Sequence, residues 1–436
     1  MNDNRAILAA LAAVLFAVGL AGCDATEASG DACESTADCS AGELCDDADK
    51  KCVCPPEGCG ANNGDGITRF GFSGDGSVSL ADLGTVQVTG DGSDPLVVAV
   101  PSGARSVAVV VEGAGSNIIL AHKITSPSGD VVFDYNNDVN TNRTDPNDGL
   151  YIVLIPSNPD VELAAGDWKL EFLTDGPDFS ATVTGVFKTA ASSSKKIDVN
   201  LFFVGVDGLD AAKAEADPGF QAILSNVSDV FGAAGIGFGQ MSYIDITGDD
   251  ADRLGIVDSV DGPSSELAQL FKLSADRSNR ALNFFFVADI GGGDAGFSLL
   301  GLAGGVPGPP SLHGTGRSGI AINMADFIGA EGDALATVSA DLELIMAHEA
   351  GHYMGLYHTT ERNGLALDDG GILGQDPLSD TPLCPDSADT SGNMVLSADE
   401  CADHGGGNLM FWSPKTNGRA LTSKQGSVIN ASAVIK

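Results

Sequence analysis

The chain has few basic residues. Its 436 residues include 22 Lys or Arg against 60 Asp or Glu, which gives a formal net charge of −38. Such a charge repels the phosphates of nucleic acids and anionic lipid surfaces. Nucleic acid and the charged face of a membrane are therefore excluded as partners. Many of the aspartates stand beside glycine, as in SGDGS and TGDDAD, a pattern typical of solvated acidic loops and also of calcium-binding loops.

The N-terminal region lacks an apolar run long enough to span a bilayer comfortably. After Arg5 the chain reads AILAALAAVLFAVGLAG and then reaches Cys23. This run is short and rich in alanine, which is typical of a secretory signal. Residues 20–23, Leu-Ala-Gly-Cys, resemble a bacterial lipobox, in which the cysteine thiol receives diacylglycerol. We expect residues 1–22 to be a lipoprotein signal peptide and residues 23–32 a lipid-anchored tether; an ordinary signal peptide with a chance cysteine is the alternative.

Cysteine is sparse outside one short segment. The chain has nine cysteines, and eight remain when Cys23 is set aside. Six of them lie within residues 33–60, whereas Cys384 and Cys401 lie near the C-terminal end. Outside the cytoplasm both groups are expected to form disulfides, Cys384 with Cys401 and the other six within a module that resembles EGF-like domains. A zinc knuckle is the alternative for the six, although no histidine accompanies them.

The rest of the chain predicts a multidomain protein. Residues 66–188 contain short β-branched runs separated by turn residues, which favours an antiparallel β-sandwich with Trp168 and Tyr151 in its core. TAASSSKK, residues 189–196, has the composition of a linker. From 197 to 436 strands and helices alternate, which predicts an α/β (α+β) domain with a mixed sheet packed on an active-site helix. Its edge strand is expected at 320–327.

Histidine is rare, with six residues in total, yet three fall within eleven positions of LIMAHEAGHYMGLYHTTERNG. On a helix, residues four apart share a face, so His348 and His352 can hold one metal ion while Glu349 reaches a water beside it. A zinc site that catalyses needs a third protein ligand and an open position. Gly355 can adopt a left-handed conformation, end the helix and turn the chain so that His358 completes the set.

The pattern His-Glu-x-x-His-x-x-Gly-x-x-His is the metzincin signature. Residues 197–436 resemble the pappalysin family of metzincin zinc peptidases through three segments: HEAGHYMGLYHTTE at 348–361, SDTP at 379–382 and GGGNLMFW around Met410. The resemblance implies a single catalytic Zn²⁺ on the three histidines. It also implies that Glu349 acts as general base and acid, and that Met410 forms a methionine turn beneath the metal ligands.

The resemblance further suggests a bound Ca²⁺, although a solvated acidic loop explains the same residues equally well. The candidate ligands are Asp368, Asp369, Asp376 and Asp380. One position departs from the family. Trp412 stands where many metzincins have a tyrosine whose hydroxyl assists the transition state, and an indole N–H can donate a hydrogen bond but cannot exchange a proton as a phenol does.

These observations predict a lipid-anchored, zinc-dependent metalloendopeptidase that cleaves proteins or peptides outside the cytoplasm. We expect a monomer, exported and attached to a bacterial membrane or the cell surface through its lipid alone, or released outside the cell. The substrate is expected to lie antiparallel to the strand at 320–327. Two alternatives stay open: a non-catalytic zinc-containing surface adhesin or binding protein, and a glycan-binding sandwich with the peptidase as a processing device.

Overall fold

The computed structural model describes residues 44–46, 51–53, 68–69, 77–113, 115–189, 195–277, 279–291, 299–310, 312–325, 327, 339–362, 376–413 and 418–436. The chain divides into two compact units, Met1–Ala61 and Asn62–Lys436. The expected signal peptide, the lipidation site Cys23, the tether and most of the cysteine-rich module lie outside the described residues. In the first unit, strands β1 (Leu44–Asp46) and β2 (Lys51–Val53) form an antiparallel pair.

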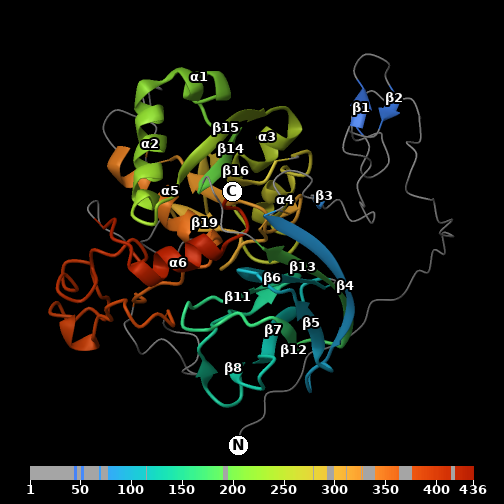
Figure 1. Ribbon diagram of the computed structural model, residues 1–436. Helices are drawn as coiled ribbons and strands as arrows, with labels where there is room; N and C mark the ends of the chain where they lie inside the picture. Colours follow the sequence, from blue (N-terminus) through green and yellow to red (C-terminus); the bar gives the residue numbers. More distant parts are fainter. Residues whose placement is uncertain are drawn as a thin grey trace, which may run out of the picture. The chain divides into compact units, whose positions relative to one another are not determined.

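The second unit begins with two antiparallel sheets that enclose an apolar core (Figure 1). Strand β5 shows the expected alternation, because its residues are buried and exposed in turn. Trp168 and Tyr151 are both buried in this core, as predicted. The first sheet contains β5 (Leu96–Val100), β12 (Gly166–Thr174), β7 (Ile118–Thr125), β8 (Val131–Asp134) and β9 (Val139–Asn140), with β10 (Asn147–Asp148) beside β7; the second contains β11 (Leu150–Ile155), β6 (Ser106–Glu112), β13 (Phe179–Lys188) and β4 (Val78–Val88).

A mixed sheet follows in the order β15–β14–β17–β21–β19. Its first four strands are parallel. Nearly all residues of β14 and β17 are buried, as expected for a sheet covered on both faces. The last strand, β19, runs antiparallel to β21. The bounds are β14 (Lys196–Val204), β15 (Gly237–Ile246), β17 (Ala281–Val287), β19 (Gly301–Ala303) and β21 (Ile320–Asn323).

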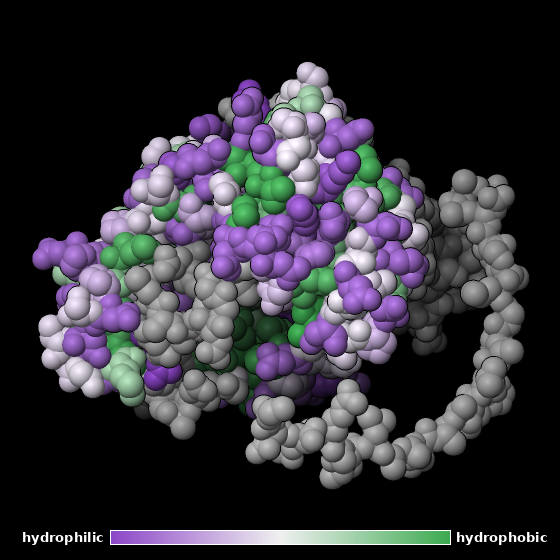
Figure 2. Space-filling view, turned by 90° about the horizontal axis from the view of Figure 1, so that it is seen from below, coloured by the Kyte–Doolittle hydropathy of each residue, from purple (hydrophilic) through white to green (hydrophobic). Residues whose placement is uncertain are grey.

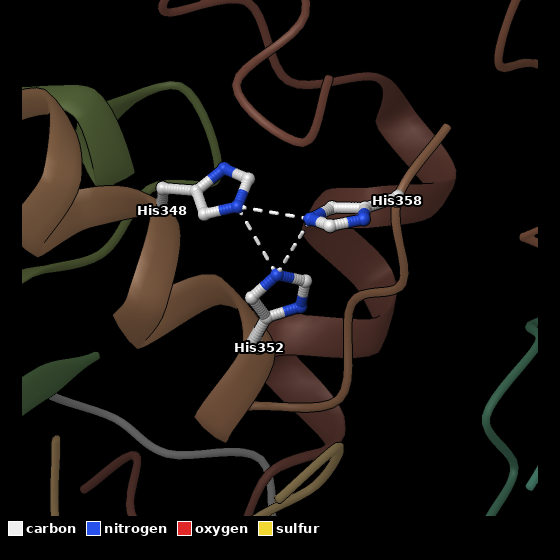
Figure 3. Close-up of side chains that lie close together, drawn as sticks. All are labelled: His348, His352 and His358. Carbon is white, nitrogen blue, oxygen red and sulfur yellow. Dashed lines mark hydrogen bonds between the residues drawn. The ribbon is translucent and has the colours of Figure 1, made fainter. Parts of the chain in front are cut away.

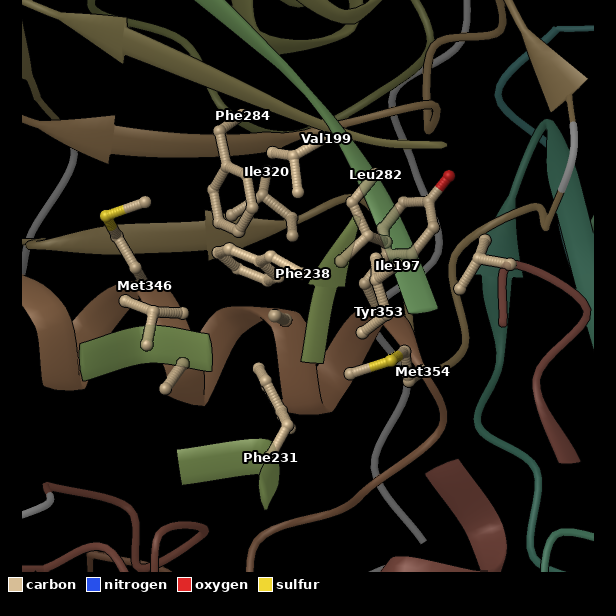
Figure 4. Close-up of a cluster of buried hydrophobic side chains, with 14 of the residues drawn as sticks. Ile197, Val199, Phe231, Phe238, Leu282, Phe284, Ile320, Met346, Tyr353 and Met354 are labelled. Atoms are coloured by element: carbon tan, nitrogen blue, oxygen red, sulfur yellow. The ribbon is translucent and has the colours of Figure 1, made fainter. Parts of the chain in front are cut away.

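Helices cover both faces of the mixed sheet. Helices α2 (Pro218–Gly232) and α5 (Ser339–Tyr353) share one apolar cluster with β14 and β17 (Figure 4). Helices α3 (Asp249–Leu254) and α4 (Glu266–Lys272) pack on the other face through Phe271 and its neighbours. The remaining elements are α1 (Ala211–Ala216), α6 (Ser423–Ala431), the 3-10 turn η3 (Asp386–Ala388), the pair β16 (Ile256–Val257) and β18 (Asp289–Ile290), and the pair β3 (Thr68–Arg69) and β20 (Leu312–His313).

The prediction of an edge strand at 320–327 is wrong. Strand β21 covers only Ile320–Asn323 and is internal, because β17 pairs with it on one side and β19 on the other. The edge is β19, which lies in a glycine-rich passage without a strand signal. A three-residue strand of Gly, Leu and Ala has no β-branched or aromatic residue to mark it, so tertiary pairing alone defines it.

The sandwich and the mixed sheet share an apolar layer. Strands β6 and β11 are buried on both faces: alternate residues such as Tyr151 and Val153 enter the sandwich core, whereas Ile152 and Leu154 enter the cluster that contains α5. Lys188 at the end of β13 reinforces this junction, since its buried ammonium group donates to two backbone carbonyls near the C-terminal end of the chain. The described residues of the second unit therefore contain two apolar cores that meet at β6 and β11.

The surface agrees with the charge of the sequence. Hydrophilic residues dominate the face in Figure 2, with smaller apolar areas between them. Among the residues that the structure describes, no helix is both long enough and apolar enough to cross a membrane.

His313 is a buried histidine outside the group of three at 348–358. It is buried beside the mixed sheet, where its ring nitrogens contact Asn283 Nδ2 at 2.7 Å and the Asn279 carbonyl at 2.8 Å. Burial lowers the pKa of His313 to about 4, and the charge of Arg277 acts in the same direction, against smaller opposing effects of Asn279 and Asp276. The ring therefore stays neutral in the folded protein.

We expect this neutral histidine to destabilise the fold in acid. Because its folded pKa lies below the ordinary value of 6.5, the unfolded chain binds a proton first, and stability falls as pH decreases from about 6.5 to 4. The loss approaches about 3 kcal/mol. The free energy of unfolding is measured in urea at pH 7 and at pH 4 for the parent chain and for His313→Gln. The difference between the two chains should be smaller at pH 4 than at pH 7 by a similar amount, because only the parent carries the titrating ring. An equal gap at both pH values would contradict this assignment.

Candidate metal centre

Helix α5 presents the first two histidines, His348 and His352, on one face, one turn apart. The helix ends in a hydrogen-bond pattern typical of a glycine C-cap: the amide of Leu356 donates to the Gly351 carbonyl at 2.9 Å, and the amide of Gly355 to the His352 carbonyl at 2.8 Å. Gly355 has φ +103°, in the left-handed region that favours glycine. The predicted turn after the helix is therefore present, and it directs the chain back toward the helix face.

The structure brings the three histidines together (Figure 3). The Nε2 atom of His348 lies 3.1 Å from that of His352 and 3.2 Å from that of His358, and the last two are 3.1 Å apart. Three ligands of a tetrahedral zinc ion, with bonds of about 2.0–2.1 Å, would be separated by about 3.3 Å. The spacing therefore fits a metal of this size.

The hydrogen bonds on the far side of each ring fix its tautomer. Backbone carbonyls only accept, so an Nδ1 atom bonded to one must carry the hydrogen, and the opposite Nε2 then presents a lone pair. Three lone pairs that converge without a proton repel one another unless a cation lies between them. The acceptors are the carbonyl of Leu409 for His348 at 2.7 Å, the carbonyl of Leu356 for His352 at 2.7 Å, and the carboxylate of Glu361 for His358 at 2.9 Å.

The pKa values of His348 and His352 favour the neutral, metal-binding form of these two rings. Burial, together with the nearby His358, lowers the pKa of His348 to about 3. Burial and the two neighbouring histidines lower the pKa of His352 well below its ordinary value. Burial raises the pKa of Glu361, but the hydrogen bond and charge of His358 outweigh it, and the net pKa is lowered. An ionised Glu361 is a strong acceptor for the third ring, an arrangement common behind metal-bound histidines.

Glu349 lies between the histidine group and the edge strand β19. The residue is half-buried, its carboxylate accepts a hydrogen bond from the backbone of Ala303, and a Cβ added at Gly301 would lie only 2.7 Å from Glu349 Cγ. Burial raises the pKa of Glu349 to about 8, against the opposing effect of Ala303. A cation on the neighbouring histidines would favour the ionised form. The position suits a group that exchanges protons with a water molecule beside the metal.

Met410 lies directly under the helix turn between the first two ligands. Its side chain is fully buried, and its sulfur would lie 2.6 Å from a Cβ added at Gly351. The Met410 carbonyl accepts from the amide of Thr359 at 2.9 Å, next to the third ligand. Its own amide donates to Asn408 Oδ1 at 2.8 Å. The side chain therefore packs against helix α5 at Gly351, between His348 and His352.

The indole of Trp412 is held by a hydrogen bond within the protein. Its indole N–H donates to the Leu396 carbonyl at 2.6 Å, and its ring packs on the cluster around the predicted disulfide. That disulfide is present between Cys384 and Cys401, both fully buried. The amide of Cys384 also donates to Thr360 Oγ1 at 3.2 Å, which ties the loop to the segment after the third ligand. The indole donor is therefore already used inside the protein.

The two suggested calcium ligands that the structure describes, Asp376 and Asp380, both have hydrogen-bond partners within the protein. Asp380 is exposed and caps helix α6, because it accepts from Thr422 Oγ1 and from the amide of Lys424, both at 2.9 Å. Asp376 is buried, and one of its oxygens accepts from Thr381 Oγ1 at 2.7 Å. Burial raises the pKa of Asp376 to about 6. Asp368 and Asp369 lie outside the described residues. In the described ranges the histidine trio is the group that could hold a metal, so a calcium site stays a prediction.

Sequence reasoning missed the groups that orient the ligands. Glu361 lies three residues after His358, inside the segment that resembles the pappalysins, and this spacing was a signal that could have been used. The carbonyls of Leu409 and Leu356 and the amide of Ala303 carry no sequence signal at all, because any residue supplies a backbone group. Their positions depend on the fold.

Comparisons with known proteins add little to this geometry. No family model matches the chain, and no curated protein matches its sequence. Metalloproteinase-II from Bacteroides fragilis is 14% identical with a TM-score of 0.24, over 45% of this chain and 59% of that one. A family two carbohydrate esterase from Clostridium thermocellum in complex with cellohexaose is 12% identical with a TM-score of 0.12, over 51% of this chain and 65% of that one.

The family two carbohydrate esterase from Cellvibrio japonicus is 9% identical with a TM-score of 0.12, and the match covers 52% of this chain and 80% of that one. The chain spans less than two thirds of the first two matched structures. At these low TM-scores the matches carry no functional argument. The resemblance to pappalysins therefore depends on the motif residues, and the function has to be argued from the site.

Gly355→Ala tests the turn that brings in the third ligand. Alanine at φ +103° is strained, and its Cβ would lie 3.1 Å from Leu154 Cδ2. We expect a loss of about 1–3 kcal/mol in the free energy of unfolding, together with a lower metal content after dialysis against Zn²⁺. Gly232→Ala at the end of α2 is the matched control, since the added methyl meets nothing within 4 Å. Equal metal content in both variants would contradict the role of Gly355.

Proposed function

We propose that the protein is a zinc-dependent metalloendopeptidase. The observation that supports this most directly is the convergence of three imidazole lone pairs at 3.1–3.2 Å, with a carboxylate at Glu349 beside them. Three nitrogen ligands and one open position are typical of catalytic zinc, whereas Ca²⁺ and Mg²⁺ prefer oxygen. Zinc in such a site acts as a Lewis acid that lowers the pKa of water and polarises a carbonyl.

Glu349 supplies the proton transfer in this proposal. Its carboxylate accepts a proton from the attacking water and returns it to the amine nitrogen that leaves. The Ala303 amide holds the carboxylate at the edge strand, so the base is oriented before substrate arrives. His348, His352 and His358 hold the cation, and their acceptors keep the rings in the metal-binding tautomer.

The proposed place for the substrate is the outer edge of β19, with which no strand pairs among the residues that the structure describes. Its other edge is paired with β21, and both of its end residues lie next to Glu349. An extended peptide can add to such an edge as a further antiparallel strand, held by backbone hydrogen bonds. The peptide then runs past the catalytic carboxylate in both directions, which favours cleavage inside a chain. This strand replaces 320–327 as the expected binding element.

The donor set at the site lacks a phenol. Because the indole of Trp412 is bonded to Leu396, the position that often carries a tyrosine supplies no hydrogen bond to an oxyanion. Stabilisation of negative charge falls to the metal and to backbone amides near β19. We therefore propose a functional but slow peptidase, exported and anchored by lipid, acting as a monomer on proteins outside the cytoplasm.

The test uses the exported chain without its lipid, residues 24–436. We expect about one zinc per chain, hydrolysis of a quenched fluorescent peptide library, inhibition by 1,10-phenanthroline and recovery with added Zn²⁺. Glu349→Gln should keep its zinc and lose about 10²–10⁴-fold in turnover, because the proton acceptor is removed while the ligands remain. Glu162→Gln, an exposed change on the sandwich, should leave turnover unchanged.

Two outcomes would overturn this function. Zinc that is bound tightly without hydrolysis of any peptide would favour the non-catalytic adhesin or binding protein. A parent chain that takes up no zinc would refute the metal site itself.

A further inference from the structure

We infer that the β-sandwich is a structural part of the metal centre, and that Arg143 positions the turn that carries the third ligand. The third-ligand turn is defined here as residues 354–358, between the end of α5 and His358. This inference rests on the metal site of the proposed function, and it assigns to the sandwich a role other than tethering or glycan binding. It places a positioning residue outside the segment that carries the zinc motif.

The third-ligand turn has little regular structure to hold it. Helix α5 ends at Tyr353, and the residues up to His358 belong to no helix or strand. The start of the turn lies against the sandwich, since Leu154 of β11 is so near Gly355 that an added Cβ would lie 3.1 Å from its Cδ2. Close contact with the sandwich thus begins at the residue where the chain reverses.

Arg143 makes the second contact, at the residue before the ligand. Its guanidinium carbon lies 4.1 Å from the centre of the Tyr357 ring, a cation–π arrangement. The single hydrogen of the Tyr357 hydroxyl has two acceptors within reach, the Val306 carbonyl at 3.1 Å and the Arg143 carbonyl at 3.3 Å. Both Arg143 and Tyr357 are at least 95% buried, so water does not compete with these contacts. The arginine side chain therefore contacts the face of the tyrosine ring, while the backbone of the same residue offers one of the two acceptors for the hydroxyl.

The arginine is itself held rigidly. Its Nε and Nη2 atoms donate to the two carboxylate oxygens of Asp145 at 3.0 and 3.1 Å, and its carbonyl also accepts from Ser157 Oγ at 2.9 Å. A planar guanidinium with two parallel bonds is fixed in orientation, which a lysine ammonium cannot reproduce. The sandwich thereby offers a preformed surface onto which the third-ligand turn packs.

Contacts on the other side of His358 complete the argument. The amide of Thr359 donates to the Met410 carbonyl, and Glu361 accepts from the ring of His358. The third ligand is therefore fixed from two directions, by the sandwich before it and by the methionine turn after it. Because metal ligation tolerates only small displacements, loosening one side should weaken metal binding before it unfolds the protein.

The experiment measures zinc affinity in residues 24–436. The variants are Arg143→Ala and Arg143→Lys, with Arg253→Ala as the matched control, since Arg253 lies on α3 and is about half exposed. Competition with a chromophoric chelator should show zinc binding about 10-fold or more weaker in Arg143→Ala. Arg143→Lys should fall in between, because it keeps the charge without the planar stack. The control should match the parent chain.

A second readout separates positioning from general stability. In the Co²⁺-substituted protein, the visible absorption of a four-coordinate site should weaken in the Arg143 variants, while urea unfolding of the metal-free chains shows that they are folded. If Arg143→Ala fails to fold, Arg143→Lys and the additional variant Tyr357→Phe, which keeps the ring and loses the hydroxyl, carry the test.

The outcomes are distinguishable from those of the proposed function. Parent-like zinc affinity and Co²⁺ absorption in folded Arg143 variants would overturn this inference and leave the peptidase proposal intact. Weaker zinc binding in these variants, in a chain that hydrolyses no peptide, would support the inference and refute the peptidase. A parent chain without zinc would overturn both.

Discussion

The site is defined by three imidazole lone pairs that are held close enough to repel one another. Each ring is held by an acceptor on its outer nitrogen, so none of the three can rotate or switch tautomer to relieve the crowding. Partly buried nitrogen lone pairs at 3.1–3.2 Å are unfavourable without a cation and favourable around a divalent one. The hydrogen-bond acceptors of the three rings therefore hold the nitrogens where a divalent cation could bind. These acceptors are the carbonyls of Leu356 and Leu409 and the carboxylate of Glu361.

Those carbonyls belong to different parts of the fold, which explains why the site needs so much of the chain. The helix supplies two of the three histidines, its glycine cap returns the chain, and the segment that follows the disulfide places Leu409 and Met410 next to the helix. The sandwich supports the turn from the remaining side. The apolar layer shared by the sandwich and the mixed sheet fixes the positions of these parts relative to one another, because close-packed side chains leave little room for one part to shift alone.

Much of this could be predicted because the signals were local. The helix, the glycine turn and the grouping of the three histidines follow from spacing within eleven residues, and the sandwich follows from alternating strands. What could not be predicted was non-local. The three-residue strand β19 exists only because β21 pairs with it, and the contact of Arg143 with Tyr357 joins residues more than two hundred positions apart. Asp380, suggested as a calcium ligand, accepts a hydrogen bond from Thr422, the N-cap of helix α6, which lies over forty residues later.

The shared apolar layer has a consequence for proteolytic processing. A cut between the sandwich and the mixed sheet would break one peptide bond without separating the fragments, because alternate residues of β6 and β11 remain inserted beside α5. Such a nicked molecule would travel as a single particle and come apart only under denaturing conditions. Shedding from an anchor would then require a cut before the sandwich, on the N-terminal side of β4.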